Sequence, residues 1–415
     1  MQAQVMTHTP SREHALGLIG MSAITSIMMT TPVISLYLNA RGLPAAHIGA
    51  VIGIMSLALV LSEVALAVTV ASRIGRRSAI ALALTGSAAT LGGFPLIGSV
   101  AGFYLNRITF GAIRGLLWPV LFAEVTDAAH PERRGRAFAV FWLYFGVGNL
   151  IGPAVGGWLG EWLSLPSAFY AAAAMSVLAL PLVLTVGTTR DPAPRNPLAI
   201  YPTLFRARGV SRTWALTACN VVMFSVYSTF LPLHAAGRGL SPAQIGVIFT
   251  GGAIAFIIGQ DVLRRVSDRW SPERLLPASF IARGAGVAMV PLLTSFGGLF
   301  LANFAAGVLT AVIPLALTTR IAARAPRDQL VAAMAGFNAS ADLGFFVGPL
   351  AGGLLAVLGL RWAFWLAVPV TAAALLLLRG SRPLGPGPDA QQSIQHHRSE
   401  EQAQIEDRIP KQPYR

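Results

Sequence analysis

Four ionisable residues lie within long apolar stretches of the sequence, away from its charged segments. They are Glu63, Arg107, Arg114 and Asp342. A charge in an apolar environment is costly, so such residues are candidates for binding or transport. A carboxyl group there resists ionisation, whereas a nearby arginine favours its charged form, so a change of surroundings can load or release a proton. Glu63 and Asp342 are therefore candidate proton carriers.

Arg107 and Arg114 are seven residues apart, which places them on one face of a helix. Gly111 lies between them and Trp118 follows one turn later, so this face carries two cations, a groove and an aromatic ring. We expect it to line a central cavity, where Arg107 responds to the proton. Two cations also suit an anionic or zwitterionic ligand. In the alternative interpretation, both arginines pair with carboxylates and hold the helices together.

The two candidate acids also have structural interpretations. Glu63 would form a permanent ion pair with Arg107 or Arg114, and Asp342 would be a hydrogen-bonded residue at a helix contact. Asn338, one turn before Asp342, and Asn149 are further candidates for ligand hydrogen bonds. For Asp261, which precedes Arg265 by four residues, and for Arg283, a structural role is the favoured interpretation.

The composition indicates which elements carry these residues. Of 415 residues, 54% are hydrophobic and 12% are charged, whereas a soluble domain has roughly a quarter charged residues. A membrane span needs about 20 apolar residues. The sequence predicts an all-α membrane protein with twelve transmembrane helices: 15–38, 46–70, 78–99, 102–125, 136–160, 165–187, 212–236, 243–264, 275–295, 297–319, 329–356 and 360–379.

The arginines between these segments predict the orientation. One set of loops, with the segments that flank it, holds 18 arginines and the alternate set holds 3, so we expect both termini in the cytoplasm of an inner-membrane protein. This bias accounts for the net charge of +14 without a nucleic-acid partner. The expected organisation is a cytoplasmic N-terminus (1–14), a six-helix bundle (15–187), a cytoplasmic linker (188–211), a second six-helix bundle (212–379) and a disordered cytoplasmic tail (380–415).

The two halves repeat each other at a shift of 196 or 197 residues. Arg41-Gly42-Leu43 recurs as Arg238-Gly239-Leu240, and Gly111 corresponds to Gly307. A glycine motif in span five recurs at the same shift in span eleven. Its residues are Gly148, Gly152, Pro153, Gly156 and Gly157, matched by Gly344, Gly348, Pro349, Gly352 and Gly353. Six spans per half is an even number, so the halves run parallel and form two pseudo-symmetric bundles.

Several motifs resemble the major facilitator superfamily over nearly the whole chain before the tail. The resemblance assigns a gating role to the loop after span two, with Ser72, Arg73, Gly75, Arg76 and Arg77, and to Asp127 after span four. The second half retains Asp268 and Arg269. The first loop departs from the family pattern, because Val68 replaces its glycine and Ser72 its aspartate.

The glycine motif of span five resembles the antiporter signature of the drug:proton exporters in this superfamily. Glycines four apart form a smooth face that another helix can approach closely, and the proline bends the helix. The alternative to a ligand-binding role is a tightly packed seam. In that interpretation, spans five and eleven both lie at the interface between the halves and make close helix contacts across it.

The function expected from these features is proton-coupled efflux of a small organic molecule by alternating access. The alternative is an uptake symporter or facilitator of an anionic or zwitterionic metabolite. Span one has no acid between Ala15 and Asn39, unlike several drug exporters of the superfamily. No hydrolase or metalloprotease motif is present, and the only lysine, Lys411, is not in a Walker A loop, which argues against an enzyme. We expect a monomer without cofactor or metal, whose partners are its substrate, protons and the lipid bilayer.

Overall fold

The structure, a computed structural model, describes residues 10–129, 133–188, 204, 206–266, 272–325 and 329–379. These residues form helices and their connections, with no strand among them. Eleven helical segments in this part of the chain are long and apolar enough to span a membrane. The remaining expected span, 275–295, is α12 (Pro272–Ala288), a 17-residue helix followed by the 3-10 turn η4 (Val290–Leu292).

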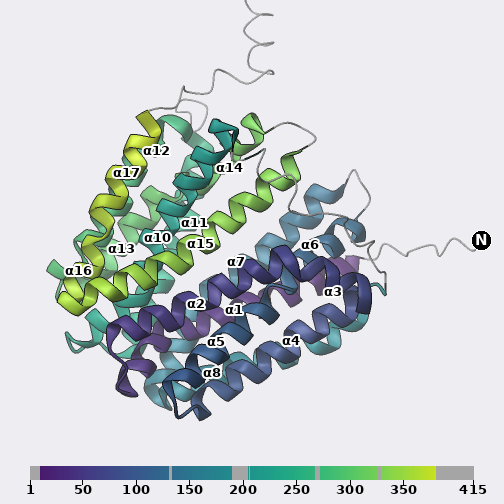
Figure 1. Ribbon diagram of the computed structural model, residues 1–415, viewed down its shortest axis with the longest axis horizontal. Coiled ribbons are helices and arrows are strands. Elements are labelled where there is room, and N and C mark those ends of the chain that lie inside the picture. Colours follow the sequence, from purple (N-terminus) through teal and green to yellow (C-terminus); the bar gives the residue numbers. More distant parts are fainter. Residues whose placement is uncertain are drawn as a thin grey trace, which may run out of the picture.

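The N-terminal bundle is built from the first half of the chain (Figure 1). Spans two and four are each divided into two helices. The break in span four, at Gly115 and Leu116, precedes Pro119, which lies in the first turn of the following helix, where its missing N–H costs no intrahelical bond. The bundle contains α1 (Pro10–Ala40), α2 (Ala45–Ala65), α3 (Ala67–Ile74), α4 (Arg76–Gly93), η1 (Phe94–Leu96), α5 (Val100–Arg114), α6 (Leu117–Ala128), α7 (Arg134–Trp162), α8 (Leu165–Leu178) and η3 (Leu180–Thr185).

The C-terminal bundle repeats this arrangement. Span ten breaks at Ala311, three residues before Pro314, as span four breaks before Pro119. The bundle contains α10 (Arg208–Ala236), α11 (Pro242–Val266), α12, η4, α13 (Phe296–Thr310), α14 (Val312–Arg324), α15 (Leu330–Leu355), η6 (Ala356–Leu358), α16 (Leu360–Trp365) and α17 (Ala367–Arg379).

The same helix pairs pack together in each bundle. In the first, α1 packs on α7, α2 on α5, and α4 on α8; in the second, α10 packs on α15, α11 on α13, and α12 on α17. The principal hydrophobic clusters also divide largely by half, although Leu36 of α1 belongs to the C-terminal cluster. One is centred on Phe230, Phe280 and Phe364, and another on Leu84, Leu121 and Phe141. Each half therefore has its own core, which allows the two bundles to move as units.

The contacts between the bundles confirm that spans five and eleven pack closely across the two halves. α7 packs against α11 and α15 against α2, with a smaller contact between α1 and α10. The glycine motifs lie at the interface between the halves, as expected, and each faces a different helix of the opposite half.

Candidate functional site

The two principal seams between the halves are made by backbone in direct contact. A Cβ atom added at Gly49 of α2 would collide with the carbonyl oxygen of Pro349, and one at Gly53 would collide with that of Phe346, both in α15. On the other seam, Gly157 of α7 faces Gly246 of α11 in the same way. The absence of side chains at these glycines lets the helices approach closely, so each seam is a tight joint between the bundles.

Most of the motif glycines pack within their own half. Gly148, Gly152 and Gly156 contact α1, where a Cβ would meet residues between Met21 and Met29. The equivalent glycines of α15 contact α10 in the same manner. Each motif therefore has two faces, one that holds the bundle together and one, at Gly157 or Gly353, that meets the other half.

Hydrogen bonds between the halves gather toward the end that carries the α1–α2 and α7–α8 turns. Ser35 of α1 donates to the carbonyl of Thr229 at 2.6 Å, and the Glu161 carboxylate accepts from the backbone N–H of Ala243 at 3.0 Å. Nearer the middle, Thr250 donates to the carbonyl of Leu150 at 3.2 Å. At this end the bundles are joined, whereas Figure 1 shows them diverging toward the ends of α14 and α6.

At the opposite end, the predicted gate residue Arg76 lies in an ion cluster inside the N-terminal bundle. Its guanidinium is 2.6 Å from Asp127 and 3.3 Å from Glu124, and Glu124 also pairs with Arg12 at 2.7 Å. The backbone N–H of Gly187 donates to Glu124 at 3.2 Å. The Glu124 side chain is 1% exposed, so it is the buried centre of the cluster.

The other residues of this loop have distinct environments. Arg77 donates to the carbonyls of Leu184 and Val186 and so fixes the end of span six. Gly75 has φ of +83°, a left-handed conformation that favours glycine, and it joins α3 to α4. Ser72 donates to the carbonyl of Thr69 at 2.8 Å, and Arg73 is exposed. The predicted partners in the second half, Asp268 and Arg269, lie outside the described residues.

The C-terminal bundle has an equivalent ion cluster of opposite polarity. Glu273 at the start of α12 is 3.1 Å from Arg320 and 3.5 Å from Arg324, both in α14. Glu273 corresponds to Arg76 and Arg320 corresponds to Glu124 at the repeat shift of 197 or 196. Both clusters tie the third span of a half to the end of its fourth span.

Glu63 and Asp342 lie on the two helices of one seam, α2 and α15, and their carboxyl groups are close enough to interact electrostatically. Both side chains are partly exposed. Within the described part of the chain, neither is within ion-pair distance of an arginine, which disagrees with a permanent pair between Glu63 and Arg107 or Arg114. Of the two candidate amides, Asn338 is exposed and Asn149 is partly buried.

The two arginines of α5 are enclosed within the N-terminal bundle. Arg114 is fully buried, donates to the carbonyl of Ala23 at 2.6 Å and lies 5.3 Å from the ring centre of Trp118. Arg107 lies 5.1 Å from the ring centre of Phe110 and contacts the sulfur of Met55 at 2.9 Å. The described residues place no carboxylate at ion-pair distance from either arginine, so aromatic rings lie against both charges, with a carbonyl at Arg114 and a thioether sulfur at Arg107.

Comparison with known proteins identifies the chain. The sequence profile of the Major Facilitator Superfamily matches residues 16–233 and 213–406. The chain belongs to this superfamily. Its members are transporters, so the protein is an integral membrane transporter of small molecules and not an enzyme. The resemblance drawn from the motifs is thereby confirmed.

Curated superfamily relatives include two drug-resistance proteins. The chain is 27% identical over 317 residues to Multidrug resistance protein 1 of Bacillus subtilis, covering 74% of this chain and 79% of the relative. It is 22% identical over 369 residues to the Quinolone resistance protein NorA of Staphylococcus aureus, covering 85% of this chain and 92% of the relative.

Solved structures confirm the fold of the superfamily. The nucleoside transporter NupG has a TM-score of 0.70 at 13% identity, covering 89% of this chain and 97% of that protein. A peptide transporter, POT, in complex with sulfate has a TM-score of 0.72 at 18% identity, covering 91% and 94%. At these identities the likeness establishes the superfamily fold alone.

The sequence analysis did not identify several residues of the two ion clusters as candidates. Glu124 was not a candidate, although it precedes Asp127 by one helical turn at the end of span four. Glu273 and Arg320 were also missed, because their partners become adjacent only when spans three and four, or nine and ten, pack together. Glu124 and Arg320 stand at equivalent positions in the two halves, 196 residues apart. This correspondence between two charged residues would have revealed both ion clusters.

Proposed function

We propose that this transporter exports a small organic molecule in exchange for protons, by alternating access between the two sides of the inner membrane. It acts as a monomer with both termini in the cytoplasm. The observation that carries the proposal is the position of Glu63 and Asp342, which face one seam between the halves without an arginine partner among the described residues. Any rocking of the bundles changes the surroundings of both acids.

The proposed cycle follows from the contacts. In the described conformation the halves are joined where Ser35 meets Thr229, at the end that we place outside the cell. The acids then face the cytoplasmic side. When the halves rock about the glycine seams, the distance between the two carboxyl groups and their access to water change together. Two carboxyl groups that repel each other electrostatically bind a proton more readily than they carry two negative charges, so this change binds or releases a proton.

In the proposed cycle, the ion clusters centred on Glu124 and Arg320 do not change. Each lies at the cytoplasmic end of one bundle and ties together helices of that bundle alone. They keep the start of the third span of each half fixed to the end of its fourth span while the seam opens and closes. In this proposal the predicted gate residues Arg76 and Asp127 maintain the shape of one half, and the joint itself is made by the glycines.

Reconstituted protein in liposomes tests the proposal. Proton flux is measured with a panel of cationic, neutral and anionic compounds, and each compound that elicits flux is then followed by uphill transport and by counterflow. In Glu63→Gln and Asp342→Asn, loss of uphill transport with retained counterflow is expected for the coupling acid. Asp261→Asn is the matched control, because Asp261 is paired with Arg264 and Arg265 at an exposed edge and should behave as wild type.

Two outcomes would overturn this assignment. Wild-type uphill accumulation in both Glu63→Gln and Asp342→Asn would exclude both acids as coupling residues. An absence of proton flux with every transported compound would exclude proton exchange and favour facilitated diffusion.

The second candidate function is uptake of an anionic or zwitterionic metabolite by symport or facilitated diffusion. Arg107 and Arg114 favour it, because two buried cations without a carboxylate partner in the described residues suit a substrate that brings its own negative charge. In the same liposomes, accumulation of anions along an inward proton gradient, abolished in Arg107→Gln, would support uptake over export.

A further inference from the structure

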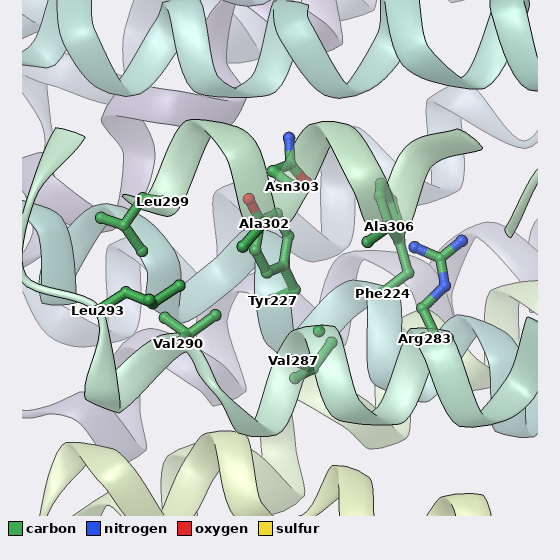
Figure 2. Close-up of a pocket in the computed structure, with 11 residues that line it drawn as sticks. Phe224, Tyr227, Arg283, Val287, Val290, Leu293, Leu299, Ala302, Asn303 and Ala306 are labelled. Carbon is green, nitrogen blue, oxygen red and sulfur yellow. The ribbon is translucent and has the colours of Figure 1, made fainter. Parts of the chain in front are cut away.

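The polar side chains around the small cavity of the C-terminal bundle do not converge on one point. This cavity lies between α10, α12 and α13, and Figure 2 shows the hydroxyl of Tyr227 directed toward Ala302 and Asn303, away from Arg283. Most of the remaining wall is apolar. These groups therefore do not form a common binding site, whereas a polar contact between the two halves does bring complementary groups together.

The end of α7 carries this contact on the face that meets the other half. Gly157, Gly160 and Glu161 share that face, because residues three and four apart on a helix lie together. A Cβ atom at Gly157 would collide with the carbonyl oxygen of Pro242, and one at Gly160 would lie 3.5 Å from the Pro242 side chain. Beside these glycines, the Glu161 carboxylate accepts a hydrogen bond from the backbone N–H of Ala243 at 3.0 Å. It thus binds the first turn of α11, in the opposite half.

The first turn of α11 is otherwise capped by its own residues. The Ser241 hydroxyl accepts from the backbone N–H of Gln244 at 3.3 Å, and the Gln244 side-chain oxygen accepts from the N–H of Ser241 at 2.9 Å, which is a capping box. Pro242 has no N–H, and the N–H of Ile245 bonds to the Ser241 carbonyl at 3.0 Å. In this described turn, only the N–H of Ala243 has its acceptor in the other half.

The charge of Glu161 suits α11 better than its own helix. Aligned backbone dipoles place partial positive charge at the N-terminus of α11 and partial negative charge at the C-terminus of α7. Glu161 lies in the last turn of α7, where its own helix disfavours a carboxylate. Contact with α11 replaces this repulsion by attraction. Because the Glu161 side chain is exposed, the attraction is weak enough to be broken in each transport cycle.

The other principal seam lacks the equivalent contact among the described residues. At the repeat shift of 196, Glu161 corresponds to Val357, which is 71% exposed. At the shift of 197, Ser241 corresponds to Pro44, and α2, which begins after Pro44, has no side-chain cap. Packing of the repeated helices therefore does not itself require a carboxylate at this position.

We propose that Glu161 is a latch between the halves, which holds the end of α7 on the N-terminus of α11. The latch rests on the proposed alternating access and acts at the end that we place outside the cell. It favours the conformation in which this end is joined, and it releases when α7 and α11 separate. Glu161 is then a positioning residue, which sets the populations of the two conformations and is not one of the proton-carrying acids.

The modification rate of a buried cysteine measures how often this end separates. In purified full-length protein in detergent, with Cys219 replaced by serine, Ser35→Cys places a thiol at a position that is 0% exposed in the joined conformation. A maleimide reacts there only when the halves part, so the rate is proportional to the parted fraction. Adding Glu161→Ala should raise the rate about fivefold, the ratio expected from the loss of one helix cap. Glu161→Gln should raise it less, since the amide oxygen still accepts a hydrogen bond but carries no charge.

Two controls separate a latch from a general effect on folding. Val357→Ala is the matched change at the equivalent position of the other seam and should leave the rate unchanged. Gln244→Ala breaks the capping box within α11 and should lower the melting temperature, again with an unchanged rate. Glu161→Ala should melt as the parent protein does, because the side chain that it removes is exposed.

The latch is rejected if Glu161→Ala reacts at the parent rate, or if Val357→Ala or Gln244→Ala accelerates the reaction as much as Glu161→Ala does. A melting temperature of Glu161→Ala as low as that of Gln244→Ala would also reject it, by assigning Glu161 a structural role. If Ser35→Cys does not fold, Thr229→Cys, at a position that is 3% exposed, is the reporter. The reaction needs no substrate or proton gradient, so an absence of proton flux in liposomes would contradict the proposed exchange and leave the latch standing.

Discussion

At the scale of single residues, the two ion clusters show what the repeat preserves. Arg76 faces Glu124 in one half, and Glu273 faces Arg320 in the other, so the charges are exchanged while the attraction between them is kept. The interaction energy depends on the product of the charges and on their distance, and neither changes when both signs are reversed. The same two helices can therefore be held together whichever of them carries the positive charge.

The burial of Glu124 predicts that it matters more than its neighbour. Glu124→Gln leaves Arg12 and Arg76 without their buried carboxylate and should lower the free energy of unfolding by about 3 kcal/mol or more. Asp127→Asn should cost about 1 kcal/mol or less, because the Asp127 side chain is 48% exposed. Thermal unfolding of both variants in detergent gives the order, and equal melting temperatures would contradict this account.

At the scale of helices, the glycine motifs divide between two kinds of packing. Gly152 lies against Met28 of α1 in its own half, whereas Gly157 lies against Gly246 of α11 in the other half. A contact within a bundle is present in every state of the cycle. A contact between bundles is made only when that seam is closed, so the two positions should respond differently to the same substitution.

Substitution by leucine separates these two kinds of packing. Gly152→Leu should destabilise the N-terminal bundle, since overpacking costs about 1–3 kcal/mol or more. Gly157→Leu should leave the bundles folded and shift the conformational equilibrium by about tenfold or more away from the closed seam. Gly146→Leu in the same helix is the control, because a Cβ there has no neighbour within 4 Å.

Distances between spin labels on the two bundles measure the shift, and melting temperatures report on folding. The assignment fails if Gly157→Leu has the same distance distribution as Gly146→Leu. It also fails if Gly152→Leu melts like wild type.

At the scale of the whole molecule, the arrangement of cross-half contacts defines two unlike ends. The described hydrogen bonds between bundles involve residues such as Ser35 and Glu161, toward the α1–α2 and α7–α8 turns. The ion clusters lie at the other end, each within one half. A molecule with two separately braced halves, joined at one end in this conformation, can rock one half against the other, which is the motion that alternating access needs.

Labelling from the two sides of the membrane tests the orientation. In a background where Cys219 is replaced by serine, Asn338→Cys should react with a membrane-impermeant maleimide from the cytoplasmic side, because this exposed residue lies in the half of α15 that we place toward the cytoplasm. Glu161→Cys, exposed at the opposite end, should react only from outside. The reverse pattern would show that the arginine bias was misinterpreted.

The sequence by itself determined the kind of molecule. Apolar segments of about 20 residues can satisfy their backbone in a bilayer only as helices, so length and composition predict an all-α membrane protein. Eleven of the twelve expected spans correspond to helices long and apolar enough to cross a membrane, and the remaining one, α12, has only 17 residues. The repeat at 196 or 197 residues predicts two similar halves, because spans with the same motifs in the same order pack in similar ways.

Only the tertiary structure decided which residues meet. The sequence left open whether Glu63 pairs with an arginine of span four, whereas the folded chain places it across a seam from Asp342, 279 positions away in the chain. It likewise predicted that spans five and eleven pack across the halves, but not which helices they meet, which are α11 for span five and α2 for span eleven. Periodicity specifies the face that a helix buries, and many partners can cover a smooth glycine face equally well. The choice among them depends on how both bundles pack as whole bodies, which no local pattern encodes.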